Sequence, residues 1–364
     1  MSTEKIKSSA NSVWEAVPGK KRVLVMMSGG VDSTAAAIML KEKGWNVAGY
    51  TMTISGDRSA ITDAEEVCRI IGIPHFYTEI EKEFRHFVSG PFCEAYKTGT
   101  TPNPCADCNE HIKFGLLIDL AEEKWGKDFF IATGHYASIK DIDGNKCLAR
   151  AGNLKKDQSY FMCGIKREHL SSVIFPLNDV KDKEETREFL RQHGISIAEK
   201  PESMEICFAN EDNYRKILQL PPQKGRILDT DGNVLGYHNG ISSYTIGQRK
   251  GLGIAAKNPL YVISIKPCDN TVTVAEREKA FCNTVRGVRL NVLYPQELTE
   301  ASTALLGKVR SQGVPAPCRI IKTDTVNRTI EVKFAEPVFA PTPGQRLVLY
   351  TPDGIVAAGA VISE

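Results

Sequence analysis

The sequence predicts a mixed α/β protein in which a domain with a parallel sheet is followed by a small linking domain and a C-terminal β-barrel. In the first half, apolar runs of strand length alternate with helical patterns, which is typical of a parallel sheet covered by helices on both faces. After about residue 212, helical patterns are scarce and short alternating runs lie between turns. We therefore expect domains at 21–212, 213–280 and 281–364, after a flexible leader at 1–20.

The first half carries clear boundaries for its elements. Its predicted strands are 22–27, 46–54, 73–80 and 129–139, and its clearest helices are 33–44 and 62–72. Both helices end at a glycine, Gly44 and Gly72, which is the residue that most readily terminates a helix. Thr62 is a candidate N-cap for the second helix.

The second half carries the turn signals of an all-β region. Tight turns are expected at Asp231-Gly232, Asn239-Gly240 and Asp353-Gly354, because these pairs adopt positive φ readily. Between the turns lie alternating runs at 225–238, 259–276, 303–324 and 327–362. This spacing favours a small β-rich domain followed by a barrel.

Composition and targeting signals indicate an ordinary globular protein of the cytoplasm. Of its 364 residues, 42% are hydrophobic and 25% are charged. The sequence has no apolar run long enough for a membrane helix and no secretory signal, so no membrane partner is expected. Thiols stay reduced in the cytosol, and most of the ten cysteines are expected to be small buried apolar residues.

Charge is distributed unevenly along the chain. Residues 1–212 hold 27 Lys and Arg against 32 Asp and Glu, whereas residues 213–364 hold 19 against 12. This asymmetry fits a catalytic domain joined to one that binds a polyanion, although chance fluctuation gives the same pattern. The basic residues of interest are Arg249, Lys250, Lys257, Arg286, Arg289, Lys308, Arg310 and Arg319.

A glycine-rich segment at 28–34, SGGVDST, stands between the first strand and the first helix. Glycines let a backbone approach a phosphate, and a helix N-terminus offers free N–H groups and a positive dipole. The segment lacks the endings of a Walker A loop and of a dinucleotide-binding loop. It resembles instead the pyrophosphate loop of the N-type ATP pyrophosphatases, which adenylate a substrate oxygen. A purely structural strand–helix turn is the alternative.

Two other positions lie where a nucleotide would bind in such a sheet. Met52 ends the adjacent strand, near the expected place of an adenine ring, and Gly134 follows a later strand. A core methionine and an ordinary turn are the alternatives.

The one close pair of cysteines, Cys105 and Cys108, lies in a proline-stiffened loop at 101–109 before a helix. Asn109 is a candidate N-cap for that helix. A thiol at a helix N-terminus is more acidic than usual, which suits a nucleophile or a metal ligand. No second CxxC follows, so a structural zinc site with four cysteines is not expected.

Four further segments carry a specific resemblance. TPNPC-x-x-CN, KKDQSY at 155–160, SMEICF at 203–208 and GNVLGYHNGISSYTIGQRKGLGI at 232–254 resemble the tRNA-specific 2-thiouridylases, in order along the chain. The resemblance implies an adenine nucleotide alpha hydrolase-like (PP-loop) domain that uses ATP and Mg²⁺. The ATP-binding residues it implies are Met26, Met27, Ser28, Gly29, Gly30, Val31, Asp32, Ser33, Met52 and Gly134.

The resemblance also implies a sulfur-transfer site and a tRNA site. Cys108 matches the nucleophile of the family, and Cys207 matches its persulfide-carrying cysteine. The implied contacts with the target base and tRNA are Asn103, Pro104, Cys105, Lys156, Asp157, Gln158, Arg310 and Ser311. Many relatives carry a tyrosine where Ser311 stands.

The chemistry implied is adenylation of the C2 oxygen of a wobble uridine, followed by attack of a sulfur nucleophile at C2. In the family, the substrates are glutamate, glutamine and lysine tRNAs, and sulfur comes from a cysteine desulfurase or a relay protein. A monomer or weak dimer is expected. Some relatives carry Asp where this chain has Cys105. Cys105, Cys108 and Cys207 are therefore candidate ligands of a 4Fe–4S cluster, and a persulfide route without metal is the alternative.

Two other functions are compatible with part of the sequence. A different adenylating ligase or amidotransferase would share the loop at 28–34 but would need neither the cysteines nor the segment at 243–253. A non-catalytic RNA-binding relative would not need the intact loop or Cys108 and Cys207.

Overall fold

The structure is a computed structural model that describes residues 5–9, 12–54, 58–199, 207–208, 217–218, 223–298 and 304–363. The chain divides into two compact units. The first comprises Met1–Phe87 and Asp107–Met204, and the second comprises Val88–Ala106 and Glu205–Glu364. This division differs from the predicted domains because the segment 88–106 packs with the second half of the chain.

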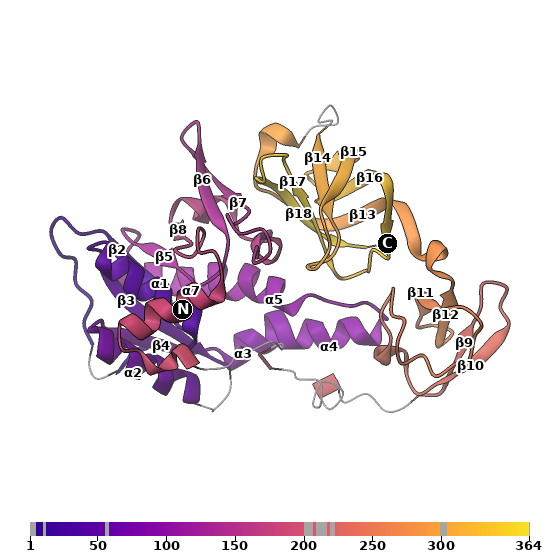
Figure 1. The fold of residues 1–364 in the computed structure, drawn as a ribbon, viewed down its shortest axis with the longest axis horizontal. Coiled ribbons are helices and arrows are strands. Elements are labelled where there is room, and N and C mark those ends of the chain that lie inside the picture. Colours follow the sequence, from indigo (N-terminus) through magenta and orange to yellow (C-terminus); the bar gives the residue numbers. More distant parts are fainter. Residues whose placement is uncertain are drawn as a thin grey trace. The chain divides into compact units, whose positions relative to one another are not determined.

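The first unit contains a sheet with the strand order β1-β4-β3-β2-β5-β8 among the described residues (Figure 1). The strands are β1 (Ile6–Ser8), β2 (Arg22–Met26), β3 (Asn46–Thr53), β4 (His75–Glu79), β5 (Phe130–Ala132) and β8 (Val173–Ile174). All of them are parallel to their neighbours except β1, which is antiparallel to β4. The chain runs outward from β2 through β3 to β4 and then returns to β5 on the other side of β2. The crevice at the carboxyl ends of β2 and β5 is therefore the switch point, where α/β sheets bind ligands.

Helix α1 (Val31–Glu42) is buried on more than one side, which explains its run of alanines. Ala36 and Ala37 pack in one core cluster with Val25 of β2. Ala35 packs in another cluster that includes Leu190 of helix α7 (Lys183–Gln192). Small side chains allow α1 to lie close to the sheet and to its neighbouring helix at once. Helix α2 (Ser59–Ile71) ends at Gly72 in the left-handed conformation, as its sequence predicts. The prediction that Thr62 caps it is wrong, because the helix begins at Ser59 and Thr62 lies within its first turn.

The prediction of a flexible leader at 1–20 is wrong for the residues that the structure describes there. Strand β1 pairs with β4 as an added edge of the sheet. Trp14 is only 4% exposed, and its indole N–H donates to the carbonyl oxygen of Asn46. The Arg22 guanidinium lies 4.2 Å from the centre of the Trp14 ring. The composition of residues 1–20 does not reveal that the segment packs on the first unit, because one buried tryptophan anchors it.

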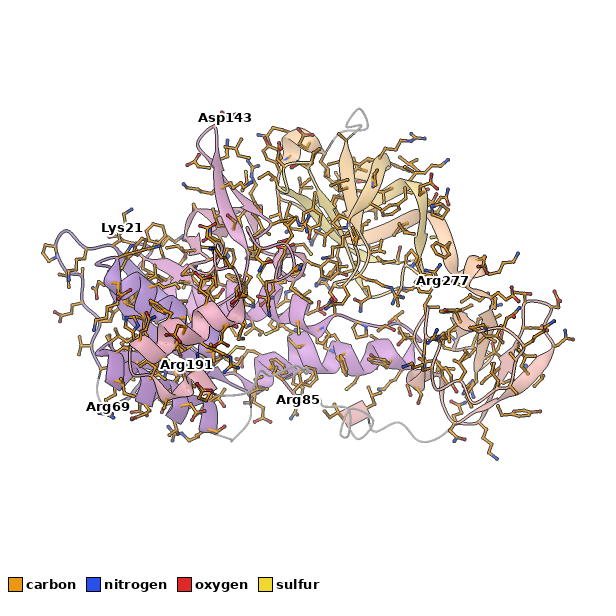
Figure 2. All side chains as sticks on the ribbon, viewed as in Figure 1. Lys21, Arg69, Arg85, Asp143, Arg191 and Arg277 are labelled. Atoms are coloured by element: carbon orange, nitrogen blue, oxygen red, sulfur yellow. The ribbon has the colours of Figure 1, made fainter. Side chains whose placement is uncertain are left out.

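The predicted strand at 129–139 is two separate elements. Strand β5 ends at Ala132, and strand β6 (Ser138–Ile142) forms a hairpin with β7 (Asn145–Ala149). The hairpin turn at Asp143-Gly144 has φ values of 50° and 79°, and Asp143 lies at its tip (Figure 2). The break between β5 and β6 places Gly134 in a turn at the switch point.

The second unit begins with helix α4 (Gly90–Lys97), which packs near the short helix Ile241–Ser243. Its central sheet has the order β10-β9-β12-β11. These strands are β9 (Gly225–Leu228), β10 (Val234–His238), β11 (Tyr261–Lys266) and β12 (Thr271–Ala275). Buried Ile227, Val262 and Val272 form the core of this small region.

The described strands of the C-terminal region close into an antiparallel barrel, which confirms that prediction (Figure 1). In barrel order they are β13 (Phe281–Val292), β16 (Thr329–Phe339), β15 (Ala316–Asp324), β14 (Leu305–Lys308), β17 (Arg346–Tyr350) and β18 (Val356–Ile362). Val332, Phe334 and Leu347 are buried in its centre. Closure leaves the barrel without the unpaired strand edges that favour aggregation. Within the described parts of the chain, no helix has the length and apolar character needed to cross a membrane.

Candidate active site

The loop at 28–30 connects β2 to the N-terminus of α1 and is shaped by Ser33. The Ser33 hydroxyl accepts a hydrogen bond from the Ser28 N–H at 3.2 Å and donates to the Gly30 carbonyl oxygen at 3.2 Å. Gly29 has φ +66°, and a Cβ there would lie 2.7 Å from the Asp63 Cβ. In the described part of the chain, no side chain caps the first turn of α1, so its amide groups are available to an anion.

Gly134 lies directly against this loop. A Cβ on Gly134 would lie 2.6 Å from the Ser33 nitrogen and 2.6 Å from the Asp32 carbonyl carbon. Because both are backbone atoms, no side chain could be accommodated by a small shift. The sequence analysis singled out Gly134 for its approach to a nucleotide, and the structure adds that it packs the turn after β5 against the start of α1.

Asp32 is held by two side chains that sequence reasoning missed. The Tyr136 hydroxyl donates to Asp32 Oδ1 at 3.0 Å, and the Lys183 ammonium lies 2.9 Å from Asp32 Oδ2. Lys183 is the first residue of α7, where a positive charge opposes the helix dipole. Because a positive charge is unfavourable at a helix N-terminus, a lysine there is a sequence signal for a nearby anionic partner such as Asp32.

The methionines of the predicted ATP site differ in exposure. Met26 and Met27 are buried, with 9% and 3% of their surface exposed, so only their backbone groups can reach a ligand. Met52 is half-buried near the end of β3. Its position beyond the end of β2 is compatible with contact to a base.

Cys108 is buried, with 6% exposure, and begins a π-helical segment that runs from Cys108 to Leu116. A short helix α5 (Pro104–Asp107) precedes it, so the helical run begins at Pro104 and not at Cys108. The prediction that Asn109 caps the helix is wrong. The cap is Asn103, whose Oδ1 accepts from the Ala106 N–H at 3.1 Å.

Asn109 has a different role in the first unit. Its Nδ2 donates to the Phe161 carbonyl oxygen at 3.2 Å, and its buried Oδ1 has no hydrogen-bond partner among the residues that the structure describes. In the π-helical segment, the Glu110 carbonyl oxygen lies 3.0 Å from where a Cβ on Gly115 would be. A glycine at 115 therefore leaves room for the Glu110 carbonyl oxygen in the π-helical turn. Single π-helical turns are frequent at functional sites.

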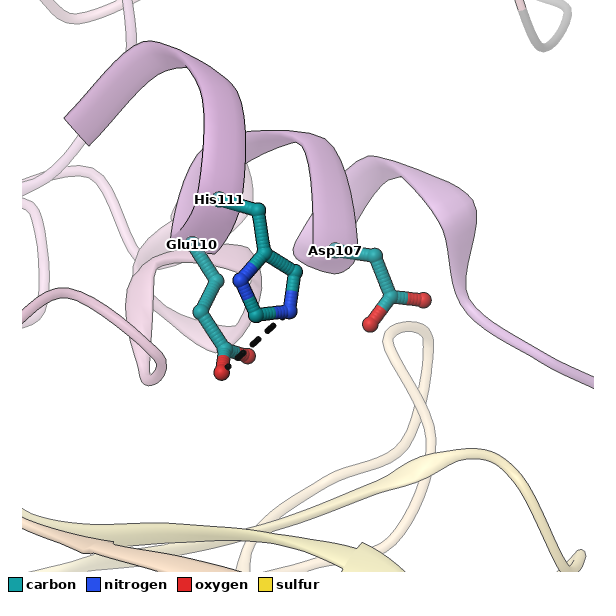
Figure 3. A group of neighbouring side chains, drawn as sticks. All are labelled: Asp107, Glu110 and His111. Carbon is teal, nitrogen blue, oxygen red and sulfur yellow. Dashed lines mark ion pairs between the residues drawn. The ribbon is translucent and has the colours of Figure 1, made fainter. Parts of the chain in front are cut away.

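Three polar side chains flank Cys108 in sequence and lie together on one face of this helical run (Figure 3). Each of Asp107, Glu110 and His111 offers an atom within 4.8 Å of the others, and His111 Nε2 lies 3.6 Å from Glu110 Oε1. The His111 ring stacks on Phe87, with ring centres 5.2 Å apart. Glu110 fills the space beside Gly164, where a Cβ would meet its carboxylate at 2.6 Å.

The segment 156–158 is built around a buried carboxylate. The Asp157 side chain is 2% exposed and pairs with Arg150 at 3.2 Å. It also accepts hydrogen bonds from the Ala151 N–H and from the N–H and hydroxyl of Ser159. Gln158 Oε1 accepts from the Tyr136 N–H at 2.9 Å, and Tyr136 in turn contacts Asp32. Asp157 and Gln158 thus shape the segment, and Lys156 is half-buried beside them.

Arg310 is engaged within the second unit. Its guanidinium donates to the carbonyl oxygens of Ala340 and Ile246, at 2.7 and 2.6 Å, and to the Thr342 hydroxyl at 2.7 Å. Ile246 belongs to the segment 243–253, whose function the sequence left unexplained. Arg310 thus joins that segment to the barrel, and Ser311 beside it is half-buried.

The remaining predicted residues differ in accessibility. Cys105 and Cys207 are exposed, and Asn103 and Pro104 are buried. The segments 201–206 and 209–216 around Cys207 lie outside the described residues. Of the basic residues, Lys308 is buried at 6% exposure, whereas Arg249 and Lys257 line a hollow in the surface of the second unit.

Comparison with known proteins places this geometry in a family. The family models that match are "tRNA methyl transferase HUP domain" at 21–211, "tRNA methyl transferase PRC-barrel domain" at 217–276 and "Aminomethyltransferase beta-barrel domain" at 284–362. A tRNA-specific 2-thiouridylase of Syntrophus aciditrophicus is 42% identical over 94% of this chain and 93% of its own length. Those of Pelobacter propionicus and Trichormus variabilis are 39% and 37% identical, over 93% and 94% of this chain and 97% and 98% of their own lengths. Identity at this level over nearly the whole of each chain shows that the protein belongs to the family of the tRNA-specific 2-thiouridylases.

Proposed function

We propose that this chain is an ATP-dependent tRNA-uridine 2-sulfurtransferase that converts the wobble uridine to 2-thiouridine. The observation that carries the proposal is the loop at 28–30, which offers uncapped amides of α1 at the switch point between β2 and β5. Such a site binds the phosphates of a nucleotide. The relatives named above are tRNA-specific 2-thiouridylases, and their substrate class is extended here to this chain.

The first step activates the base. The C2 oxygen of uridine attacks the α-phosphorus of ATP, the bond from that phosphorus to the bridging oxygen of the β-phosphate breaks, and pyrophosphate leaves with the electron pair. The N3 proton of the base is released at the same time. The carbonyl oxygen is thereby converted into part of a good leaving group, AMP. Asp32 has the carboxylate that Mg²⁺ prefers, and the ion would neutralise phosphate charge there.

The second step replaces oxygen with sulfur. We propose that a persulfide on Cys207 attacks C2 with its terminal sulfur and that AMP leaves. The Cys108 thiolate then attacks the Cys207 sulfur, so that the S–S bond breaks and its electron pair leaves with the sulfur on C2. N3 takes up a proton from solvent, which gives the C2=S group of 2-thiouridine. A Cys108–Cys207 disulfide remains, and an external thiol must reduce it before the next turnover. Exposure of Cys207 supports this assignment because a sulfur donor must reach it.

The same thiols, with Cys105, provide the donor set for a 4Fe–4S cluster with one open iron, which would supply a bound sulfide. Iron and sulfide analysis of anaerobically purified protein decides between the routes. Absence of iron together with full activity of Cys105→Ala supports the persulfide route. Stoichiometric iron that is lost with Cys105→Ala supports the cluster.

The proposed partners are glutamate, glutamine and lysine tRNAs and a cysteine desulfurase or its relay protein, in the cytoplasm, with the chain acting as a monomer or weak dimer. The exposed Arg249 and Lys257 support contact with RNA phosphates, which makes binding weaken steeply with salt. We further propose that Asn103, Pro104, Cys105 and Lys156 lie near the RNA, and that Asp157, Gln158 and Arg310 order the segments beside it. Ser311 is proposed as a contact between the barrel and the tRNA.

The decisive experiment is mass spectrometry of tRNA nucleosides after incubation with ATP, cysteine and a desulfurase. The expected result is 2-thiouridine, together with pyrophosphate release that requires tRNA. Pyrophosphate release with a small acid or amine in place of tRNA would indicate a different adenylating ligase. tRNA binding without pyrophosphate release would indicate a non-catalytic relative.

A further inference from the structure

We propose that the barrel turn Ala340–Gln345 positions the loop 101–105 for sulfur transfer, and that Gln345 is its main positioning residue. The proposal rests on the proposed function, because that loop carries the candidate contacts with the target base. All of the groups involved belong to the second unit. Gln345 is about 240 residues away from the loop in sequence, and neither motif nor spacing connects the two.

The Gln345 amide holds two consecutive peptide groups of the loop. Its Nε2 donates to the Thr101 carbonyl oxygen at 3.0 Å and to the Pro102 carbonyl oxygen at 3.1 Å. The Thr101 N–H donates to the Pro343 carbonyl oxygen at 2.9 Å. A side-chain amide nitrogen has two hydrogens, so both of its donor positions are used.

Prolines in the loop favour this arrangement. Pro102 and Pro104 have no N–H group, so these two positions offer no amide donor to another segment. Carbonyl oxygens are therefore the main groups, beside the Thr101 N–H, through which another segment can fix the loop. A glutamine amide supplies the donors that they need without bringing a charge.

A glycine allows the turn to approach the loop this closely. Gly344 has φ +93°, and a Cβ there would lie 2.8 Å from the Thr101 carbonyl oxygen. The turn itself is fixed to the barrel, because the Gly344 N–H donates to Ile362 at 2.9 Å and the Ile362 N–H donates to Gln345 at 2.8 Å. The loop therefore rests on a rigid edge of the barrel.

The central region holds the other side of the loop. Gly99 packs on Ile265, where a Cβ would meet the side chain at 2.9 Å. The Thr101 hydroxyl lies 3.4 Å from that of Thr245. Beyond these anchors, Asn103 caps the helix that begins at Pro104, and both are buried. A displacement of the Thr101 backbone would therefore also displace Asn103 and Cys105, because the prolines make the segment between them stiff.

The consequence concerns the reaction and not the affinity for substrates. Misplacement of a reacting group by about 1 Å can cost on the order of 10²-fold in rate. Loss of the Gln345 donors should therefore lower the rate of sulfur transfer. The affinity for ATP should be unchanged, because the loop at 28–30 belongs to the first unit.

The test compares Gln345→Met, which keeps the length but removes the donors, with Gln345→Glu and with Gln312→Met, an exposed glutamine of the same barrel, as the control. Single-turnover formation of 2-thiouridine is measured together with tRNA affinity, ATP affinity and hydrogen exchange of the peptide that spans 99–107. For Gln345→Met and Gln345→Glu we expect about 10-fold slower sulfur transfer. Hydrogen exchange should be faster in that peptide, with both affinities within about twofold of the unchanged protein.

Three outcomes would overturn the proposal. The first is an unchanged rate of sulfur transfer together with unchanged hydrogen exchange at 99–107 in Gln345→Met. The second is a loss of tRNA affinity in that variant as large as its loss of rate. The third is an equal effect of Gln312→Met on rate and exchange. Hydrogen exchange needs no substrate, so it tests the contact separately from the reaction. If the unchanged protein forms no 2-thiouridine but Gln345→Met still shows faster exchange at 99–107, the proposed function is overturned and the positioning contact stands. If Gln345→Met does not fold, Gln345→Asn, which shortens the donor, provides the same comparison.

Discussion

The loop at 28–30 in the first unit and the loop at 101–105 in the second unit both depend on glycines, but they are held in different ways. The first is shaped by its own neighbours in sequence, since Ser33 bonds to Ser28 and Gly30. The second is held by a barrel turn that comes near the end of the chain. The proposed phosphate loop is therefore shaped by adjacent residues, whereas the proposed base-contacting loop depends on contacts with the end of the barrel.

The largest effect should come from Cys108→Ser, which separates the two chemical steps. A serine hydroxyl is a far weaker nucleophile than a thiolate at neutral pH. We expect 2-thiouridine formation to fall by about 10³-fold or more, while tRNA-dependent pyrophosphate release continues for one turnover. Cys268→Ser, at an exposed cysteine of the second unit, serves as the control and should be active. Equal loss of pyrophosphate release in Cys108→Ser would place Cys108 in the adenylation step.

Gly134→Val should break the local loop. Its side chain would overlap the backbone at Asp32 and Ser33, which cannot move without shifting α1. We expect ATP affinity to fall by about 100-fold, measured by calorimetry, with hydrogen exchange at 99–107 unchanged. Gly134→Ala should give a smaller loss in the same direction. ATP affinity equal to that of the unchanged protein would show that the turn after β5 is not part of the nucleotide site.

Lys183→Met removes the cation that holds Asp32. Because Lys183 orients the carboxylate that is proposed to hold Mg²⁺, loss of the ion pair should misplace the charge that stabilises the leaving pyrophosphate, and we expect adenylation about 10-fold slower. Lys181→Met is the matched control, since Lys181 is an exposed lysine just before the same helix. Initial rates of pyrophosphate release at saturating ATP provide the measurement. A control variant that is as slow as Lys183→Met would argue against a specific role.

The difference between the two loops also explains what the sequence could predict. Residues 28–34 join a strand to a helix that are adjacent in sequence. The hydrophobic periodicity of these two elements and the glycines between them therefore predicted the loop directly. The partners of Asp32 were missed because Tyr136 and Lys183 meet it only after the sheet has formed. Gln345 was missed because it meets Thr101 and Pro102 only after the second unit has folded. The leader prediction was wrong because Trp14 is buried against residues that come much later in the chain.

The two units should also respond differently to acid and to mutation, and the tryptophans make this measurable. Trp14, Trp45 and Trp125 are the three tryptophans of the chain and all lie in the first unit. Their fluorescence therefore reports unfolding of the first unit, and hydrogen exchange of barrel peptides reports the second.

Burial lowers the pKa of His75 to about 4, and its ring lies between the hydroxyls of Ser9 and Thr51. The folded state thus keeps a neutral ring while the unfolded state takes up a proton below its ordinary value near 6.5. This contribution to stability is present above about pH 6.5 and is lost as the pH falls toward 4, by up to about 3 kcal/mol. Urea titrations followed by tryptophan fluorescence should show the loss, and His75→Asn should flatten it. An unchanged slope in His75→Asn would exclude His75 as its cause.

Arg310→Met tests the second unit alone. Its guanidinium bonds to Ile246, Ala340 and Thr342, which join the segment 243–253 to the barrel. Removing it takes the guanidinium donors away from the Ile246 and Ala340 carbonyl oxygens and leaves them the Thr342 hydroxyl. We expect the second unit to lose about 2 kcal/mol of stability, with faster hydrogen exchange at 243–253. Arg310→Lys should recover only part of this, because an ammonium cannot match the planar fork of a guanidinium. Arg319→Met, at an exposed arginine of β15, is the control. The tryptophan transition should stay where it is in all three variants, and a shift of that transition in Arg310→Met would mean that the two units do not unfold separately.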